Sequence, residues 1–435
     1  MDNKTNSFQI ILVGAFAFFI VVGVIVFSTV RSGSEVIFPE VTIWGTAPKR
    51  SFDVAYGALN LQRTKKEGQL NVTYVEKRKG EFESDLIEAL ASGKGPDAVI
   101  LPEDFIVKHA DKIYPVSFES LSLRDYKDLY ADAAEIFLVE KGSLGFPLYA
   151  DPLVMYWNKD IFASEGIAEP PRYWTEFFTL SESLSRKDSV GNITRSAVAL
   201  GEFSNVRNAK GILSALFFQA GTPIVEEVGG EYRSVLNKGR QGGVDPAQSV
   251  IAFFTDFSNP NKASYSWNRS LPESQQRFIA GDLAVYFGYA SELAEIRLKN
   301  PNLNFDVAVF PQLQDAKVNV TSARVYSLAI LKSSSDISGT FSTLVVLAGK
   351  DFASMFSENA ALPPLRRDLL RDKPDDPDLS IFYDSAIISK SWLDPDGLRT
   401  NAVFENMVED VSAGRSKISD AVLRASQEIG AMLQN

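Results

Sequence analysis

The feature that most constrains this sequence is an uncharged, strongly apolar run close to its start. Phe8–Val30 contains no Asp, Glu, Lys or Arg and consists mainly of Ile, Val, Phe, Leu, Ala and Gly. At about 1.5 Å per residue, a helix of this length reaches about 34 Å, enough to cross a hydrocarbon core about 30 Å thick. A core helix of the same length would normally keep a polar face, which this run lacks. We therefore predict one transmembrane helix over 8–30.

The alternative for the same run is a cleaved signal peptide. Signal peptides usually have an apolar core of only about 7–15 residues followed by a small-residue cleavage site. Residues 27–32 read FSTVRS and form such a site poorly, so a retained helix is favoured while cleavage stays open. Lys4 and Arg31 flank the run on opposite sides, and the positive-inside rule therefore leaves the orientation undecided.

Cysteine and histidine usage narrows the chemistry. The chain has no cysteine and a single histidine, His109, which excludes disulfides, thiolate chemistry and the lipid-bearing cysteine that anchors many exported proteins. One histidine also leaves little for a zinc site or a histidine-based triad. We expect no metal site and no cofactor, and we expect His109 on the surface of a helix.

The remaining composition favours a large acidic globular part. Roughly four hundred residues follow the apolar run, which is enough for two domains with full-sized cores. The net charge is −11, whereas a nucleic-acid-binding protein needs a basic face. We therefore expect no nucleic-acid partner.

Short apolar strands alternate with amphipathic helices in the first part of this region. The pattern predicts strands at 41–44, 70–76 and 98–101 and helices at 54–66 and 82–91. This order favours an α/β fold with a mainly parallel sheet. Ligands of such sheets bind beyond the carboxyl ends of the strands, where Trp44, Glu103 and Asp104 lie. Core packing for Trp44 and helix capping for the two carboxylates explain them equally well.

One segment carries a resemblance to a known family. Residues 145–162 read GFPLYADPLVMYWNKDIF and resemble the segment of carbohydrate-type (family 1) extracellular solute-binding proteins of ABC importers in which a strand crosses between lobes. Four later stretches match the family in the same order, at 211–222, 277–285, 305–311 and 325–331. The resemblance covers about residues 40–365. Val285, where the family usually has Met, and the displaced aromatic Tyr289 depart from the pattern.

The resemblance implies a two-lobed periplasmic-binding-protein fold of type II, with a hinge between the lobes. Lobe 1 would comprise 37–149 and 327–365, and lobe 2 would comprise 151–325, with C-terminal helices at 366–435 packing across both. It also implies a monomer that meets the transmembrane subunits of an ABC permease. The lobes would then be extracytoplasmic on a single-pass cell-membrane anchor, with 1–7 in the cytoplasm and 31–36 as a linker.

The family binds its solute in the cleft between the lobes and performs no catalysis, which implies that this chain has no catalytic residues. The expected ligand is a small solute, a sugar or an oligosaccharide, because carboxylates and aromatic faces suit hydroxyl pairs and sugar rings. The resemblance and the topology together give the following ligand-binding candidates: Trp44, Glu103, Asp104, Asp151, Trp267, Tyr289 and Tyr326.

Two other classes of function stay open at this level. A sensory or adhesive binding protein without a permease would carry the same sequence features. A carbohydrate-active enzyme is less favoured, because the sequence has carboxylates but no nucleophile elbow, no phosphate loop and no metal-binding cluster.

Overall fold

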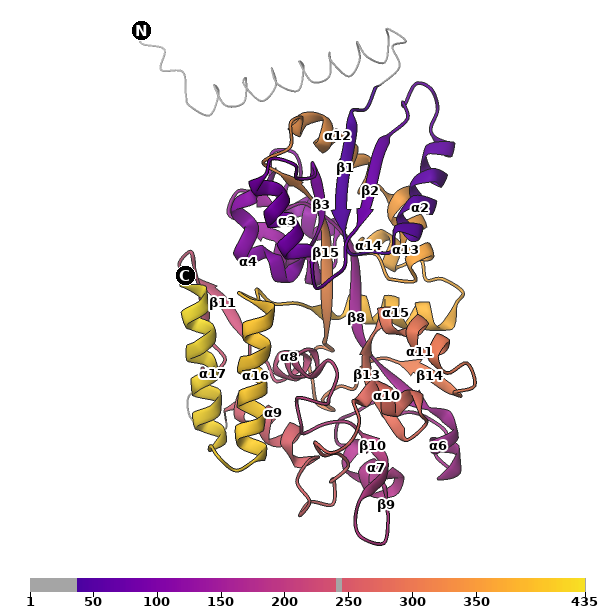
Figure 1. The fold of residues 1–435 in the computed structure, drawn as a ribbon, viewed down its shortest axis with the longest axis vertical. Helices are drawn as coiled ribbons and strands as arrows, with labels where there is room; N and C mark the ends of the chain where they lie inside the picture. The colour runs from indigo at the N-terminus through magenta and orange to yellow at the C-terminus, as the bar shows by residue number, and fades with distance from the viewer. Residues whose placement is uncertain (1–36, 240–244, 435) are drawn as a thin grey trace, which may run out of the picture.

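The computed structural model describes residues 37–239 and 245–434 (Figure 1). The predicted cytoplasmic segment 1–7, transmembrane helix 8–30 and linker 31–36 lie outside this part. Within the described ranges, no helix combines the length and the apolar character that crossing a bilayer requires.

Eleven strands of the described part form one mixed sheet that runs through both halves of the molecule (Figure 1). Its main path is β2-β1-β3-β15-β8-β13-β10-β9, and three strands pair beside it: β4 (Ile113–Tyr114), β14 (Phe305–Ala308) and β16 (Ser389–Lys390). The bounds along the path are β2 Asn71–Glu76, β1 Glu40–Gly45, β3 Ala98–Pro102, β15 Thr321–Leu331, β8 Phe146–Asn158, β13 Leu283–Tyr289, β10 Ile193–Val198 and β9 Arg186–Lys187.

Lobe 1 is built on β1, β2 and β3, which run parallel as the sequence predicts. Helices α2 (Lys49–Gln62) and α3 (Phe82–Ala91) connect them. Helix α2 begins five residues earlier than predicted, directly after Pro48, and ends where Arg63 takes an extended conformation. The Phe52 ring on this helix stacks on Tyr74 of β2 with centroids 4.3 Å apart. Residues after β15 return to this lobe, where α13 (Lys350–Ala360) packs against α2.

Lobe 2 is built on β13, β10, β9 and β14 (Phe305–Ala308), together with the far end of β8. An aromatic cluster fills its core: the Trp174 ring contacts Phe177, Phe253, Phe287 and Phe310 with centroids 5.1–5.5 Å apart. The helices of this lobe are α6 Lys159–Ser164, α7 Glu176–Leu184, α8 Ala209–Gln219, α9 Pro246–Asp256, α10 Ser274–Ile279 and α11 Leu293–Lys299.

Two long antiparallel strands, β8 and β15, join the lobes (Figure 1). All residues of β8 are buried, which explains its nearly continuous apolar sequence, because a strand covered on both faces has no need for alternation. Asp151 of β8 pairs in register with Arg324 of β15 near the middle of the crossing. Two polar residues thus interrupt the apolar strands at the level where the lobes meet.

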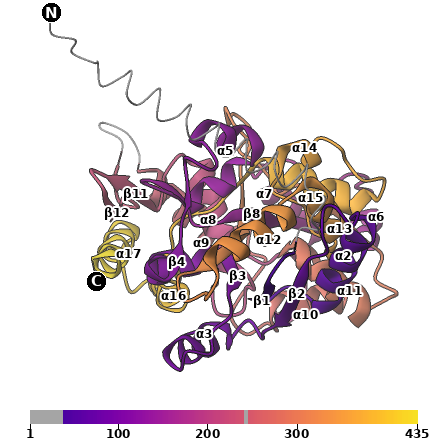
Figure 2. The same cartoon turned by 90° about the horizontal axis from the view of Figure 1, so that it is seen from above.

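The segment after residue 365 contacts both lobes. Helix α14 (Arg367–Leu370) lies against α5 (Leu123–Leu129) of lobe 1, and α15 (Pro377–Ile387) lies against β8 and β14. Helices α16 (Gly397–Ser412) and α17 (Ile418–Leu433) pair with each other and pack on α9. Figure 2 shows α17 beside the hairpin of β11 (Val225–Val228) and β12 (Glu231–Ser234).

Candidate functional site

A cavity of about 680 Å³ lies between the lobes, within the range of about 300–1,000 Å³ that is typical of small-molecule sites. Lobe 1 contributes the turn before α3 and the end of β3 with the 3-10 turn η1 (Glu103–Phe105). Lobe 2 contributes the start of α8 and the end of β13. The crossing strand β15 and the segment 391–405 close the remaining sides. The cavity therefore has walls from both lobes and from the hinge.

The floor is formed by Arg324, whose guanidinium lies 3.6 Å from the centroid of the Tyr289 ring. Its Nη1 is 3.7 Å from Oδ2 of Asp151. Asp151 is nearly fully buried and accepts hydrogen bonds from the backbone N–H and the hydroxyl of Ser291, at 2.9 and 2.8 Å. Burial raises the pKa of Asp151 despite the opposing Arg324. Desolvation opposes the charge of Arg324, but Tyr289 and Asp151 hold its pKa above the ordinary value.

The wall from lobe 1 carries two adjacent carboxyl groups. Oε2 of Glu103 accepts a hydrogen bond of 3.0 Å from the backbone N–H of Val325. Burial and the neighbouring Asp104 raise the pKa of Glu103 to about 8. Burial also raises the pKa of Asp104, against the attraction of Lys79. At neutral pH Glu103 is therefore largely a neutral acid that can both donate and accept a hydrogen bond.

Lys79 extends into the cavity from the turn before α3. Desolvation, and then the positive charge of Arg324, lowers the pKa of Lys79, while Glu103 and Asp104 pull in the opposite direction. At the hinge the cavity thus brings Lys79 and Arg324 together with Glu103 and Asp104, and Asp151 lies beside Arg324.

Two tyrosines fix the aromatic part of the site. The Tyr326 ring stacks on Tyr149 with centroids 4.4 Å apart and planes 13° apart. Burial raises the pKa of Tyr289 to about 12, and burial also places the pKa of Tyr326 well above its usual range. Both hydroxyls are therefore protonated hydrogen-bond donors at any physiological pH. The guanidinium of Arg324 already covers one face of the Tyr289 ring.

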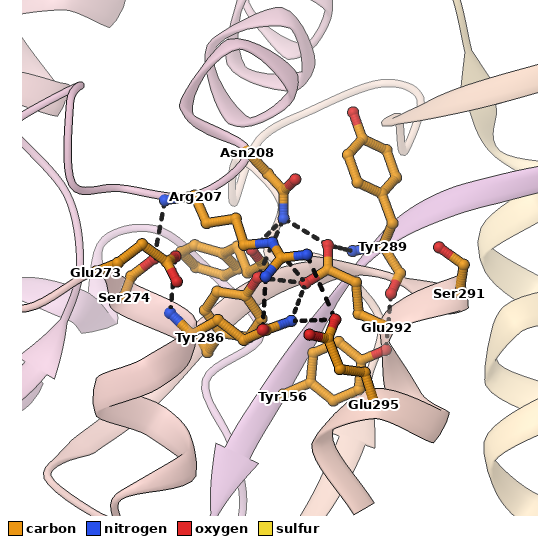
Figure 3. Close-up of polar contacts among 12 residues, drawn as sticks. Tyr156, Arg207, Asn208, Glu273, Ser274, Tyr286, Tyr289, Ser291, Glu292 and Glu295 are labelled. Atoms are coloured by element: carbon orange, nitrogen blue, oxygen red, sulfur yellow. Dashed lines mark hydrogen bonds and ion pairs between the residues drawn. The ribbon is translucent and has the colours of Figure 1, made fainter. Parts of the chain in front are cut away.

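A buried carboxylate, Glu292, organises the wall from lobe 2 (Figure 3). Its Oε1 accepts from the Asn208 side chain at 2.7 Å and from the Tyr289 backbone N–H at 3.1 Å. Its Oε2 accepts from Gln275 at 2.8 Å and from the Tyr286 hydroxyl. Figure 3 shows the Tyr289 ring pointing away from this carboxylate.

The same network fixes the start of α8. Asn208 has a φ of 64°, a left-handed conformation that Asn tolerates better than most residues. Gly211 follows in the first turn, and a Cβ added there would lie 2.3 Å from the Tyr289 hydroxyl oxygen. Glycine is therefore required for this close approach. Asn208, Gly211 and Tyr289 all line the cavity.

The C-terminal wall is held by lysines. Nζ of Lys210 pairs with Asp394 and contacts the hydroxyl of Thr400 at 2.6 Å. Nζ of Lys108, from α4 (Ile106–His109) of lobe 1, lies 3.2 Å from Asp396, which caps the start of α16. These ion pairs attach the segment 391–405 to both lobes.

The structure brings together four of the seven residues that the sequence nominated. Glu103, Asp104, Tyr289 and Tyr326 line the cavity. Asp151 lies at the hinge beside Arg324 rather than on the cavity surface.

Trp44 and Trp267 are placed differently from the prediction, because neither lines the cavity. Trp44 is half-buried, and the Nζ of Lys77 covers its ring at 3.8 Å. Trp267 is 0% exposed inside lobe 2, where its Nε1 donates to Asn205 at 2.9 Å. The geometry therefore assigns Trp267 to the core and places Trp44 outside the cavity lining.

Sequence reasoning missed most of the other cavity residues, among them Lys79, Lys210, Arg324 and Trp392. Arg324 carried a usable signal, since it is a lone charge inside the apolar strand 321–331. Lys79, Lys210 and Trp392 carried none that distinguishes them from other lysines and aromatics. The prediction for His109 was wrong: its side chain is buried against the Phe105 ring, and Nε2 lies 3.0 Å from Oε1 of Glu83.

Within residues 37–239 and 245–434, no group of three or more His, Cys, Asp or Glu side chains is arranged to hold a metal ion. The chemistry of the cavity is that of hydrogen bonding, ion pairing and ring contact.

Comparison with known sequences and structures identifies relatives. The sequence model of a family described as bacterial extracellular solute-binding protein matches residues 52–361. No curated protein sequence matches this chain.

Among solved structures, a cyclic alpha-maltosyl-1,6-maltose binding protein from Arthrobacter globiformis has a TM-score of 0.73 at 15% identity, covering 92% of this chain and 100% of that chain. A cyclo/maltodextrin-binding protein complexed with maltotetraose has a TM-score of 0.72 at 16% identity, covering 91% and 97%. A maltotriose binding protein from Thermus thermophilus has a TM-score of 0.62 at 16% identity, covering 90% and 99%. These similarities confirm the two-lobed periplasmic-binding-protein fold.

Proposed function

The chain belongs to the bacterial extracellular solute-binding protein family, and from that premise we propose that it binds an oligosaccharide in the cavity between its lobes. Membership confirms the family predicted from the sequence. It also makes the chain a binding protein of ABC transport rather than an enzyme. The open question is therefore which solute the cavity holds.

One observation carries the proposal: polar and aromatic groups converge on the cavity from both lobes and the hinge. Glu103 and Asp104 come from lobe 1, Tyr289 from lobe 2, and Arg324 and Tyr326 from the crossing strand. Sugar hydroxyls need groups that donate and groups that accept, and a largely neutral Glu103 does both. Sugar rings also need apolar faces. Solved proteins of the same fold carry maltotetraose and maltotriose, which supports the same ligand class here.

Anchoring and delivery form the second part of the proposal. Residues 8–30 hold the lobes to the membrane on the extracytoplasmic side, and the closed, loaded lobes meet the transmembrane subunits of an ABC importer. The uncharged run and the absence of cysteine support this anchor. The proposal is tested by extracting membranes with carbonate: the full chain should stay in the pellet, and a chain lacking residues 1–30 should be released. Release of the full chain would contradict the anchor.

The ligand is tested by thermal melts of the chain against a library of oligosaccharides, peptides and polyamines. A ligand that binds only the folded state raises the melting midpoint, and at least one oligosaccharide should do so. If a peptide or polyamine raises the midpoint and no sugar does, the carbohydrate proposal is wrong.

Two lysines provide matched variants for this screen. Lys79→Met removes a charge from the cavity and should abolish most of the sugar-dependent shift. Lys77→Met removes the same charge two residues earlier, where Lys77 covers Trp44 and pairs with Asp85. The Lys77→Met variant should keep the shift. Equal loss in both variants would show that the cavity does not hold the sugar.

A further inference from the structure

The strands of lobe 1 all begin at one edge of its sheet. Glu40, the first residue of β1, pairs in register with Asn71, the first residue of β2. Because β1, β2 and β3 run parallel, the segments that precede them meet at the same edge. The turn after β15 joins them, since the backbone N–H of Leu331 donates to the carbonyl of Asp97 ahead of β3. We call this surface the amino edge of lobe 1, and it consists of residues 37–40, 61–70, 92–97 and 332–336.

The amino edge is also the described surface nearest in sequence to the predicted transmembrane helix. The uncharged run ends at Val30, and Ile37 on the amino edge follows seven residues later. Seven residues span at most about 25 Å even when fully extended. With residues 8–30 in a bilayer, as proposed above, the chain length alone keeps the amino edge within about 25 Å of the end of that helix.

Two large apolar side chains protrude from the amino edge. Ile37 and Leu61 are each 89% exposed, the highest fraction among the large apolar side chains of residues 37–239 and 245–434. The backbone around Leu61 is fixed, because the side-chain amide of Asn60 donates to the carbonyl of Leu70 at 3.0 Å. Such exposure is unfavourable in water, whereas apolar side chains are stabilised at the boundary between lipid headgroups and acyl chains.

The charge of the amino edge differs from that of the whole chain, which is −11. Its four segments carry five basic side chains and four acidic ones: Arg63, Lys65, Lys66, Lys94 and Lys332, and Glu40, Glu67, Asp97 and Asp336. Three of the acids accept hydrogen bonds within the fold, from Thr64, Thr42 and Gly339 respectively for Glu67, Asp97 and Asp336.

Three of the lysines, by contrast, are free to contact a partner. Lys65, Lys66 and Lys94 are exposed, and none of them forms an ion pair with another residue in the described part of the chain. Unpaired cations beside exposed apolar side chains are the combination that binds the surface of an anionic bilayer.

We propose that the amino edge of lobe 1 lies on the membrane surface, with Ile37 and Leu61 among the headgroups and Lys65, Lys66 and Lys94 against the phosphates of anionic lipids. This inference rests on the anchor in the proposed function. It fixes lobe 1 on the bilayer and leaves lobe 2 to move. The interlobe cavity opens at the carboxyl edge of the same strands, about 20 Å away, which is the length of the six-residue β1.

The contact is tested by fluorescence quenching, because the chain has no cysteine and one introduced cysteine carries a single label. Full-length Leu61→Cys and Val190→Cys are reconstituted into vesicles of equal parts phosphatidylcholine and phosphatidylglycerol with a headgroup spin-labelled lipid. Val190 is the matched control, being 80% exposed between β9 and β10 at the opposite end of the long axis (Figure 1). Quenching at position 61 should be at least about five-fold stronger than at position 190. A label at Lys94→Cys should be quenched like that at position 61.

Charge reversal tests the lipid headgroups as the partner. Lys65→Glu combined with Lys66→Glu should lower quenching at position 61 at least about two-fold, because each lysine near an anionic surface adds attraction. Lys317→Glu combined with Lys417→Glu makes the same change of charge at two exposed lysines away from the amino edge and should leave the quenching unchanged. In vesicles of phosphatidylcholine alone, the effect of Lys65→Glu with Lys66→Glu should disappear.

Equal quenching at positions 61 and 190, or equal effects of the two double variants, would overturn this inference while the anchor stands. Release of the full chain from membranes by carbonate would overturn the anchor and this inference together. The melt screen against oligosaccharides is independent of both outcomes.

Discussion

Two carboxyl groups on opposite lobes, the buried Glu292 and the partly exposed Glu103, have opposite roles. Glu292 in lobe 2 accepts hydrogen bonds from four donors and is saturated. Glu103 in lobe 1 accepts one, from the Val325 backbone, and lies beside a second carboxyl group. A carboxyl group whose oxygens already accept hydrogen bonds from several donors supports the fold, whereas one with a single donor can still bind a ligand. The number of donors, and not the residue type, therefore decides the role. The wall of lobe 2 is preorganised, while that of lobe 1 keeps hydrogen-bonding capacity for the solute.

The largest expected effect follows from removing the saturated group. Glu292→Leu removes the shared carboxylate acceptor of Asn208, Gln275 and Tyr286 inside lobe 2, which should lower the free energy of unfolding by about 3–5 kcal/mol. Urea denaturation measures it. The matched variant Glu295→Leu removes a half-exposed carboxylate at the edge of the same network, where it pairs with Lys299 and Arg207, at a cost below about 1 kcal/mol. Equal losses would mean that the network does not support lobe 2.

The opposite behaviour is expected for Glu103. Glu103→Gln removes an acid that must take up a proton on folding above its unfolded pKa, so at neutral pH the variant should be at least as stable as the unmodified chain. Binding of the sugar found in the melt screen should weaken about ten-fold, because an amide cannot reproduce the donor and acceptor positions of the acid. Calorimetry measures the affinity of Glu103→Gln for the sugar. Glu202→Gln is the control, because Glu202 is a buried carboxyl group that pairs with Arg269 outside the cavity. Unchanged affinity in Glu103→Gln would remove Glu103 from the site.

The pH dependence of stability should also distinguish the two walls. A carboxyl group whose folded pKa is raised stabilises the fold fully below its unfolded pKa, near 4.5, and loses that contribution as the pH rises through its folded pKa, about 8 for Glu103. The groups that face it are Asp104, Lys79 and Arg324. Melting midpoints should therefore fall from about pH 5 to about pH 8 in the unmodified chain relative to Glu103→Gln. Parallel curves for the two proteins would contradict the raised pKa.

The smallest effect is expected at the ion pair that joins the walls. Lys108 lies 3.2 Å from both Glu83 of lobe 1 and Asp396 at the start of α16. Because the pair is partly exposed, Lys108→Met should cost less than about 1 kcal/mol of stability. Solution X-ray scattering from the ligand-free variant should show a slightly larger radius of gyration, because one ion pair between lobe 1 and the segment 391–405 is gone. A loss of several kcal/mol would mean that Lys108 supports the core.

The sequence predicted the architecture well because the signals were local. Alternating strands and helices over 41–101 reflect burial, which hydrophobic patterns report directly, whereas the crossing strand 146–158 was expected from the family resemblance. Glu103 and Asp104 were found because they follow a strand at the carboxyl edge of the sheet.

The remaining site residues depend on contacts that are distant in sequence. Lys210 faces Asp394 across 184 positions, and Trp392 reaches the cavity only because this pairing holds its segment. A tryptophan ring is suited to stack on a sugar, but Trp267 lies inside the core, where its N–H donates a hydrogen bond to Asn205. No local pattern distinguishes an aromatic residue that lines a cleft from one that fills a core.

A crystal structure of the chain with the oligosaccharide that most raises its melting midpoint tests the central claim most directly. The account predicts sugar density between the lobes, with hydroxyls within hydrogen-bonding distance of Glu103 and Asp104 on one wall and of Asn208 or the Tyr289 hydroxyl on the other. Sugar density elsewhere on the molecule, with the interlobe cavity left empty, would contradict it.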